Sequence, residues 1–410
     1  MLKRLLAILA ALLLAFGLFG CAVTQTNPPE SNTTTTTTEP ATEPEPEPVE
    51  IRIQFAGDIL LHRGPIDAAN VGPSVYDFRP FLTDIRPFID GDLAIANMET
   101  PIDVLGGNRD ITTFPRFNAP FEILEALQYA GFNHLVASNN HSLDRGFDGM
   151  VATIRNFERA GIDFTGIYED ENAFNTPTII DVNGIQVGII AYTESLNGLD
   201  PLIPVEMRPF AVRRFRVYTT ADVPAMGEDI AALREAGAEV VIVSLHWGAE
   251  YVNAPTETQR QIARGLVDVG ADVIMGHHAH VVQPIEWHYR EDESRGLIIY
   301  SLGNFLADQT RLQRPIPATQ YSMLVSVQVT RQPDGEITLM CEVLPVLAMR
   351  DRTGNTMGIV NGLGMMPLIG GELPDFVTDT YLRDWGRRAY AHVLNIVGEE
   401  FVQYDSMLNA

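Results

Sequence analysis

Three histidines crowd into one short stretch of the chain. The apolar residues 273–275 end at Gly276, and His277, His278 and His280 follow at once. Neutral imidazole is the commonest protein ligand for metal ions. If this segment is extended, His278 and His280 point to the same side and His277 faces away. The pattern predicts a metal or catalytic site here rather than a solvated loop cluster or an expression tag.

Other side chains able to bind metals or transfer protons follow further short apolar runs. They are Asp58, Glu99, Asn140, His141 and His246. In open α/β sheets, ligands bind at the edge where parallel strands have their carboxyl ends. Because each of these residues is expected just past a strand, we expect all of them to converge on one such edge.

The expected ligand set combines oxygen and nitrogen atoms. Two carboxylates, an amide oxygen and several imidazoles suit Mn or Fe(II) and are acceptable to Zn. A carboxylate such as Glu99 can bridge two ions, and such a pair activates water for in-line displacement. His141 can protonate a leaving oxygen, as hydrolysis of a phosphoester requires.

Strands and helices alternate along the chain, which predicts an α/β fold. Strands are expected at 51–56, 93–96, 135–137, 178–182, 185–191, 239–245, 272–275, 297–300, 321–330 and 337–347. Helices are expected at about 80–89, 121–130, 147–160, 221–236, 259–269 and 379–404. Asn183 and Gly184 predict a tight hairpin turn. Asp144 is expected to cap the helix that begins near Phe147.

Six motifs in this order resemble those of the CapA family, over about residues 51–347. The family is associated with poly-γ-glutamate capsule synthesis and belongs to the calcineurin-like metallophosphatase superfamily. The motifs are Gly57-Asp58, Asn97-Met98-Glu99, Ser138-Asn139-Asn140-His141-Ser142-Leu143-Asp144, His246-Trp247-Gly248-Ala249-Glu250-Tyr251, Gly276-His277-His278-Ala279-His280-Val281 and Tyr300-Ser301-Leu302-Gly303-Asn304-Phe305.

The resemblance implies a metallophosphatase-like four-layer α/β/β/α sandwich with a helical C-terminal extension. It also implies two divalent ions, Mn, Fe or Zn, along one edge. Asp58 stands where the first ion is bound, and Glu99 where the bridging carboxylate stands. Asn140 and His246 stand at the second ion. His278 and His280 resemble the superfamily's histidine pair.

The same resemblance suggests roles for further residues of the site. His141 stands where the superfamily has its acid, directly after the metal-binding Asn. The extra imidazole leaves open whether His277 or His278 is the ligand. Asn97, Asn139 and Asn304 are additional candidates, although asparagines of this kind also serve as turn residues.

One position departs from the superfamily pattern. Its first motif usually places a histidine two residues after the aspartate, and this chain has Leu60 there. His62 is near but out of phase, so we interpret it as non-catalytic. The first ion is therefore expected to have one ligand fewer.

The net charge and the number of cysteines limit the kinds of partner and of covalent cross-link that the protein can have. The formal net charge is −25, and nucleic-acid binding needs clustered Lys and Arg, so no nucleic-acid partner is expected. An anionic substrate would need a local positive centre such as a metal ion. Two cysteines are too few for a disulfide framework, and Cys341 is expected to pack as a small apolar residue.

The N-terminus resembles a bacterial lipoprotein signal, residues 1–21, with Cys21 as the lipidated residue; an uncleaved membrane anchor is the alternative. Residues 22–50 are rich in Thr, Pro and Glu and are expected to form a disordered tether. Residues 51–350 would form the CapA-like domain and 351–410 the helical extension. Both interpretations of the N-terminus place the body outside the cytoplasm, where a lipid would anchor it to the cell membrane.

Besides a secreted nucleotidase-like phosphatase unrelated to any capsule, the sequence leaves two functions open. The first is a metal-dependent hydrolase that acts on a phosphoester or a polymer amide bond of the cell envelope. The second is a non-catalytic subunit of a complex for capsule assembly or export, with capsule-synthesis proteins as partners.

Overall fold

The computed structural model describes residues 47–103, 110–309, 316–350 and 363–402. The expected signal segment with Cys21 and most of the expected tether lie outside these residues. The first strand, β1 (Val49–Leu60), begins two residues earlier than the sequence predicts. Among the described residues, no helix has both the length and the apolar character for crossing a bilayer.

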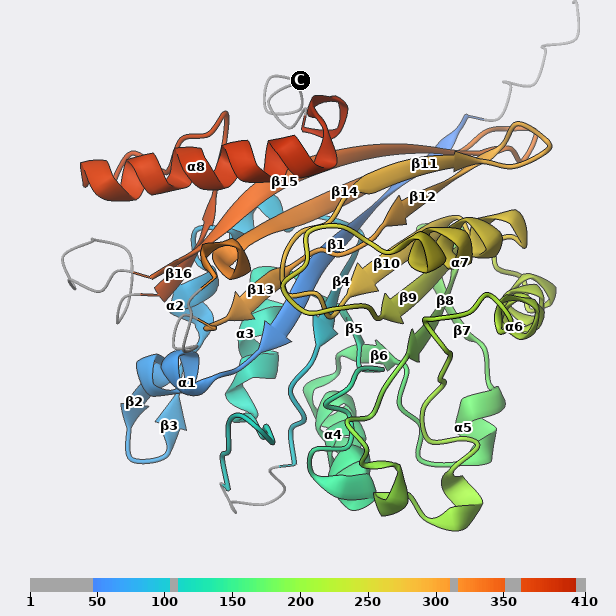
Figure 1. Cartoon of the computed structure of the whole chain (residues 1–410), viewed down its shortest axis with the longest axis horizontal. Helices are drawn as coiled ribbons and strands as arrows, with labels where there is room; N and C mark the ends of the chain where they lie inside the picture. Colours follow the sequence, from blue (N-terminus) through green and yellow to red (C-terminus); the bar gives the residue numbers. More distant parts are fainter. Residues whose placement is uncertain (1–46, 104–109, 310–315, 351–362, 403–410) are drawn as a thin grey trace, which may run out of the picture. The chain divides into compact units, whose positions relative to one another are not determined.

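Two β-sheets lie at the centre of the fold (Figure 1). The first sheet has the order β16 (Leu363–Pro367), β15 (Ile337–Arg350), β14 (Tyr321–Arg331), β1, β4 (Leu93–Met98), β5 (His134–Val136) and β6 (Asp163–Thr165), and β13 (Asn304–Ala307) also pairs with β1. The second sheet has the order β11 (Ile285–Tyr289), β12 (Arg295–Ile299), β10 (Val273–His277), β9 (Val240–His246), β8 (Ile185–Thr193) and β7 (Thr178–Val182). A separate hairpin joins β2 (Asn70–Gly72) and β3 (Val75–Tyr76).

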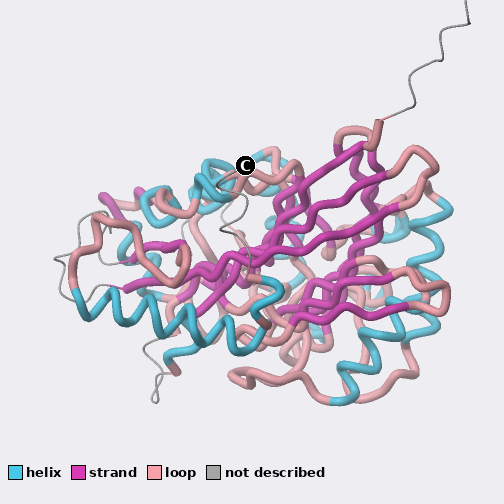
Figure 2. Tube along the Cα trace, turned by 90° about the horizontal axis from the view of Figure 1, so that it is seen from above, coloured by secondary structure: helices cyan, strands magenta, loops and turns pink. Residues whose placement is uncertain are grey.

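Helices cover the outer face of each sheet (Figures 1 and 2). The first sheet packs on α1 (Arg63–Ala69), α2 (Arg79–Leu82), α3 (Glu122–Ala130) and α4 (Gly146–Ala160). The second sheet packs on α6 (Val223–Glu235) and α7 (Glu257–Asp268). A third apolar cluster lies between the sheets and includes Phe55 and Ile95 of the first and Ile189 and Ile242 of the second. This layer order confirms the predicted four-layer α/β/β/α architecture.

The C-terminal part of the chain adds both a strand and a helix. Helix α8 (Thr380–Val397) places Leu382, Ala389 and Val393 in the cluster between the sheets. It contacts β14 and β15, and Figure 1 shows it lying along these two strands. The predicted helical extension is therefore present, but the sequence did not predict β16, which pairs with β15.

Most expected elements form, and the exceptions have local causes. The hairpin of β7 and β8 turns at Asn183 and Gly184, as predicted. The helix expected at 80–89 is broken into α2 and a 3₁₀ turn, Arg86–Phe88. Pro87 explains the break, because proline lacks a backbone N–H and disfavours helical geometry in the residue before it. Short elements without a clear periodicity were missed, among them α1, α5 (Glu171–Asn175) and β6.

Strand β1 reaches further than predicted and so contains Asp58. It pairs with β14 up to Phe55 and with β13 from Asp58 onwards, with a bulge between Asp58 and Ile59. Gly57 permits this exchange of partners, because a Cβ atom there would lie 1.9 Å from the Gly303 carbonyl oxygen. Asp58 consequently lies inside a strand rather than after one, and its backbone is held on both sides.

Candidate metal centre

Six predicted ligands meet at the carboxyl ends of both sheets. We call Asp58, Glu99, Asn140, His246, His278 and His280 the ion-binding cluster. Glu99 directly follows β4, and His246 is the last residue of β9. The first sheet supplies the acids and Asn140, and the second sheet supplies the three imidazoles. Five of the six side chains are buried and His278 is partly buried. The predicted convergence on one edge is therefore correct.

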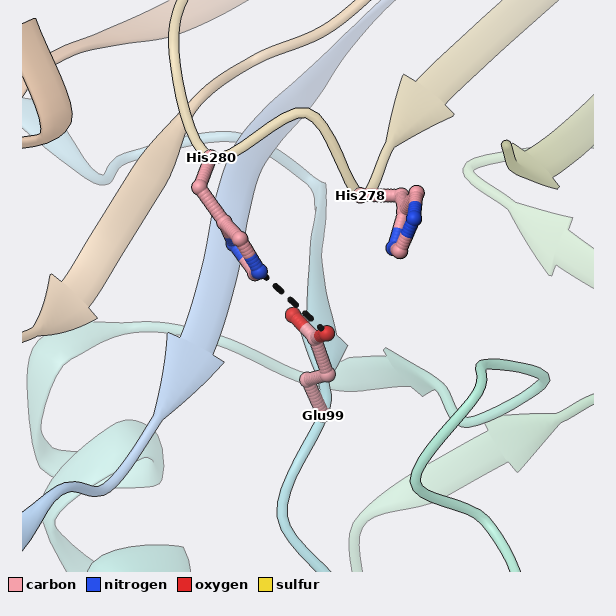
Figure 3. A group of neighbouring side chains, drawn as sticks. All are labelled: Glu99, His278 and His280. Carbon is pink, nitrogen blue, oxygen red and sulfur yellow. Dashed lines mark ion pairs between the residues drawn. The ribbon is translucent and has the colours of Figure 1, made fainter. Parts of the chain in front are cut away.

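Glu99 lies at the middle of the ion-binding cluster. Its Oε1 is 3.4 Å from His246 Nε2 and 3.9 Å from His280 Nε2. Figure 3 shows the Glu99 carboxylate facing His280, with His278 on the adjoining loop. Ligand atoms of Glu99, His278 and His280 lie within 4.8 Å of one another, and so do those of Asp58, Glu99 and His246. Glu99 belongs to both groups, as a carboxylate shared between two ions would.

The Glu99 side chain is fully buried, and neither of its oxygens has a hydrogen-bond partner in the protein. A carboxylate buried without any hydrogen bond is strongly unfavourable, even with the His280 imidazole in ion-pair range at 3.9 Å. Burial, and then the nearby charge of Asp58, raise the pKa of Glu99 to about 8. A divalent cation in contact with these oxygens would remove the imbalance, so the residues present fit a bound cation.

Asp58 is held in one orientation by three neighbours. Asn97 donates from Nδ2 to Asp58 Oδ1 at 2.8 Å, and His277 Nδ1 lies 3.1 Å from the same oxygen. His280 Nδ1 lies 3.1 Å from Oδ2. Burial by itself raises the pKa of Asp58, but hydrogen bonds from His277 and His280 outweigh it and hold this pKa well below its usual range. Asp58 is therefore ionised and ready to bind a cation.

His246 is also close to two further ligands of the cluster, Asn140 and His278. Its Nε2 lies 3.0 Å from Asn140 Oδ1 and 3.1 Å from His278 Nδ1. Burial lowers the pKa values of both His246 and His278 well below the usual range, and neighbouring imidazoles lower them further. Both rings are consequently neutral, which is the form that binds metal ions.

The triple-histidine segment is not extended, so the expectation that His277 faces away is wrong. Strand β10 ends at His277, and His278 and His280 then adopt left-handed backbone conformations with φ of 86° and 57°. These two bends bring all three rings to the cluster. Left-handed conformations of this kind cost about 1–3 kcal/mol each and persist mainly at functional sites. His277 contacts Asp58, whereas His278 contacts His246, which favours His278 as the second-ion ligand.

Asp144 does not cap α4, contrary to the prediction. Residue Arg145 occupies the N-cap without a side-chain hydrogen bond. Instead, Asp144 Oδ2 lies 2.7 Å from His141 Nδ1 and accepts a hydrogen bond from the Phe117 backbone N–H at 2.7 Å. His141 donates from Nδ1 to this carboxylate, so Nε2 is the ring atom left to exchange a proton with a substrate.

Residues 52–309 match the family model described as "Bacterial capsule synthesis protein PGA_cap". The match covers more than half of the chain. The chain belongs to this capsule synthesis family.

Curated relatives agree with this membership. The PGA biosynthesis protein CapA of Bacillus subtilis is 30% identical over 299 residues, which is 71% of this chain and 70% of that protein. The capsule biosynthesis protein CapA of Bacillus anthracis is 29% identical over 269 residues, which is 63% of this chain and 60% of that protein. The alignment thus spans less than two thirds of the B. anthracis protein. The predicted family is confirmed.

Among solved structures, the calcineurin-like phosphoesterase YfkN from Bacillus subtilis is similar to this chain. The identity is 14% and the TM-score 0.41, with 72% of this chain and 90% of that chain covered. At this score the likeness carries no argument about activity.

The three asparagines that the sequence offered as additional site residues all lie beside the ion-binding cluster. Asn97 orients Asp58, as described. Asn139 donates from Nδ2 to the Met98 carbonyl oxygen at 3.0 Å, and its Oδ1 accepts from the His141 backbone N–H at 3.1 Å. Asn139 therefore braces the loop that carries Asn140 and His141. Asn304 contacts His280 across 3.0 Å.

Leu60 is buried in a small apolar cluster with Phe117 and Ala307. His62 does not substitute for the missing imidazole, since its Nδ1 lies 3.1 Å from the Leu60 carbonyl oxygen and its ring packs on Phe117. Phe117 also packs edge-on against His141, with ring centroids 4.7 Å apart. Nothing in the sequence around Phe117 indicates its place beside His141. The spacing of His141 and Asp144, three residues apart, was a signal for the contact between those two side chains.

Proposed function

We propose that this protein is a metal-dependent hydrolase of the bacterial cell envelope that cleaves a phosphoester or an amide bond of a capsule polymer such as poly-γ-glutamate. The observation that carries this proposal is the buried Glu99 carboxylate, which accepts no hydrogen bond from the protein and belongs to two groups of ligand atoms. Asp58, Glu99 and His280 would hold one divalent ion. Glu99, Asn140, His246 and His278 would hold the other, and Mn, Fe(II) and Zn all suit these ligands.

The chain's own residues divide the work as follows. Divalent cations, when bound, would supply positive charge for the developing oxyanion and a water nucleophile at neutral pH. Asp144 holds the His141 ring through Nδ1, and His141 gives a proton from Nε2 to the leaving oxygen or nitrogen. Phe117 packs on this ring and limits the access of water to it. Five of the six cluster side chains are buried, which strengthens these electrostatic interactions.

A combined binding and activity measurement tests this proposal. Purified protein is expected to contain or bind two divalent cations and to hydrolyse bis(p-nitrophenyl) phosphate or a γ-linked glutamyl peptide. His278→Ala should lose both properties. The matched control is His288→Ala, because His288 pairs with Asp268 at 2.8 Å outside the cluster. If the wild-type protein binds no cation, the proposed enzymatic function is wrong. Cation binding without hydrolysis of either substrate would favour a non-catalytic subunit of a capsule-assembly complex.

We further propose that the protein works outside the cytoplasm, anchored by a lipid on Cys21 and positioned beside other capsule-synthesis proteins. The signal-like N-terminus supports this proposal. Cys21→Ser should move the protein from the membrane fraction to the soluble fraction of cells. Retention of this variant in the membrane fraction would contradict lipid anchoring.

A further inference from the structure

Asn304 is a buried residue whose amide group has a single allowed orientation. It is the first residue of β13, it pairs with Asp58 across the parallel strands, and its side chain is fully buried. Its Nδ2 donates to the Thr319 carbonyl oxygen at 2.9 Å and to Gln309 Oε1 at 2.9 Å. Since a backbone carbonyl can only accept, the atom facing Thr319 has to be the nitrogen.

This orientation decides which atom of Asn304 faces the ion-binding cluster. Oδ1 lies 3.0 Å from His280 Nδ1, and Asp58 Oδ2 lies 3.1 Å from the same nitrogen. Both oxygens are acceptors, so His280 Nδ1 must carry the proton. The lone pair of a neutral His280 is then on Nε2, which is the nitrogen that faces Glu99 Oε1 at 3.9 Å.

We propose that Asn304 is a positioning residue that fixes the His280 tautomer and ring orientation so that Nε2 binds a cation. The proposal rests on the cation site of the proposed function. Ligating histidines usually donate their other N–H to an oxygen, and loss of that oxygen typically lowers metal affinity about 10–100-fold. Thr319 and Gln309 fix the orientation of the Asn304 amide, and this amide in turn fixes the tautomer and orientation of the His280 ring.

The hydrogen-bonded chain continues outward from Asn304. Gln309 donates from Nε2 to the Tyr251 hydroxyl at 3.3 Å. The Tyr251 ring is half-buried and tilted, with its centroid 6.0 Å from that of His280. The orientation of a buried ligand is thereby connected to a side chain that reaches the surface.

Two measurements test this inference. In Zn²⁺-loaded protein with ¹⁵N-labelled histidines, His280 is expected to carry its proton on Nδ1 and none on Nε2. In calorimetric titrations with Mn²⁺ alone, Asn304→Leu should weaken one of the two equivalents by about 10–100-fold. Asn304→Asp keeps an oxygen acceptor for His280 but loses the hydrogen bonds that Nδ2 donates to Thr319 and Gln309, so its affinity should lie between those of Asn304→Leu and the wild type. Asn156→Leu is the matched control: Asn156 is also fully buried, and it donates to the Ile102 carbonyl oxygen instead.

The outcomes separate this inference from the proposed function. A wild-type His280 with its proton on Nε2 would overturn the inference even if no variant folds. So would Asn304→Leu binding both equivalents of Mn²⁺ like the wild type. Wild-type protein that binds both cations but hydrolyses nothing would overturn the hydrolase and leave the role of Asn304 standing. Protein that binds no cation would overturn both.

Discussion

Glu99→Gln is expected to stabilise the cation-free protein and to abolish its response to divalent cations. The wild-type carboxylate is fully buried and accepts no hydrogen bond, and such a group destabilises the folded state by about 1–3 kcal/mol. A neutral amide of the same shape relieves this cost but cannot bridge two cations. Thermal unfolding without cations should therefore occur at a higher temperature in the variant, and added Mn²⁺ or Zn²⁺ should stabilise only the wild type.

The difference in stability between Glu99→Gln and the wild type should depend on pH in a defined direction. Burial raises the pKa of Glu99 from 4.5 to about 8. Below pH 4.5 the carboxyl is neutral in both the folded and the unfolded state, so the two proteins should be equally stable. As the pH rises towards 8, ionisation favours the unfolded wild type, and the advantage of the glutamine variant should grow.

Glu342→Gln is the control for this experiment. Glu342 also has a buried, unpartnered oxygen and a pKa raised by burial, but it lies on β15 away from the ion-binding cluster. It should leave the response to cations intact. If Glu99→Gln still bound two cations with wild-type affinity, the bridging role of Glu99 would be wrong.

The second large effect is expected for His141→Ala. Loss of a positioned general acid lowers the rate of hydrolysis about 10²–10⁴-fold, while cation affinity should hardly change because His141 is not a ligand. Steady-state kinetics should show the loss in kcat rather than in KM. With a substrate whose leaving group departs without a proton, the difference in kcat between His141→Ala and the wild type should be smaller.

His62→Ala provides a close comparison for His141→Ala. Both rings pack on Phe117, with centroid distances of 5.2 and 4.7 Å. Burial lowers the pKa of His62 to about 4, so this ring is neutral at physiological pH. His62→Ala should therefore retain most of the activity. Equal losses in the two variants would show that His141 acts by packing and not by proton transfer.

The sequence predicted the convergence of Glu99 and His246 because each stands at the end of a strand that its own apolar pattern reveals. Glu99 after β4 and His246 at the end of β9 needed only these local signals and the rule about carboxyl ends. The turn at Asn183 and Gly184 was equally local. Periodicity therefore suffices wherever a residue's position depends on its own segment.

The parts that the sequence did not predict depend on contacts between distant segments. The extension of β1 through Asp58 follows from pairing with β13, more than two hundred residues away. The left-handed conformations of His278 and His280 could not be predicted, because most histidines have a negative φ and nothing in the local sequence marks these two as exceptions. The contact between Asp144 and His141 could have been predicted from their spacing of three residues. Helix capping explained the same aspartate equally well, and only the structure decides between the two.

The division of ligands between the two sheets has a mechanical consequence. Acids from one sheet and imidazoles from the other would bind the same cations. Metal binding would therefore act as a non-covalent cross-link between two sheets that otherwise meet through apolar contacts and a few polar ones, such as the pair of Arg331 and Glu239. Ligand occupancy and the docking of the two sheets are then thermodynamically linked. Loosening the interface far from the chemistry would weaken metal retention, and losing metal would loosen the interface.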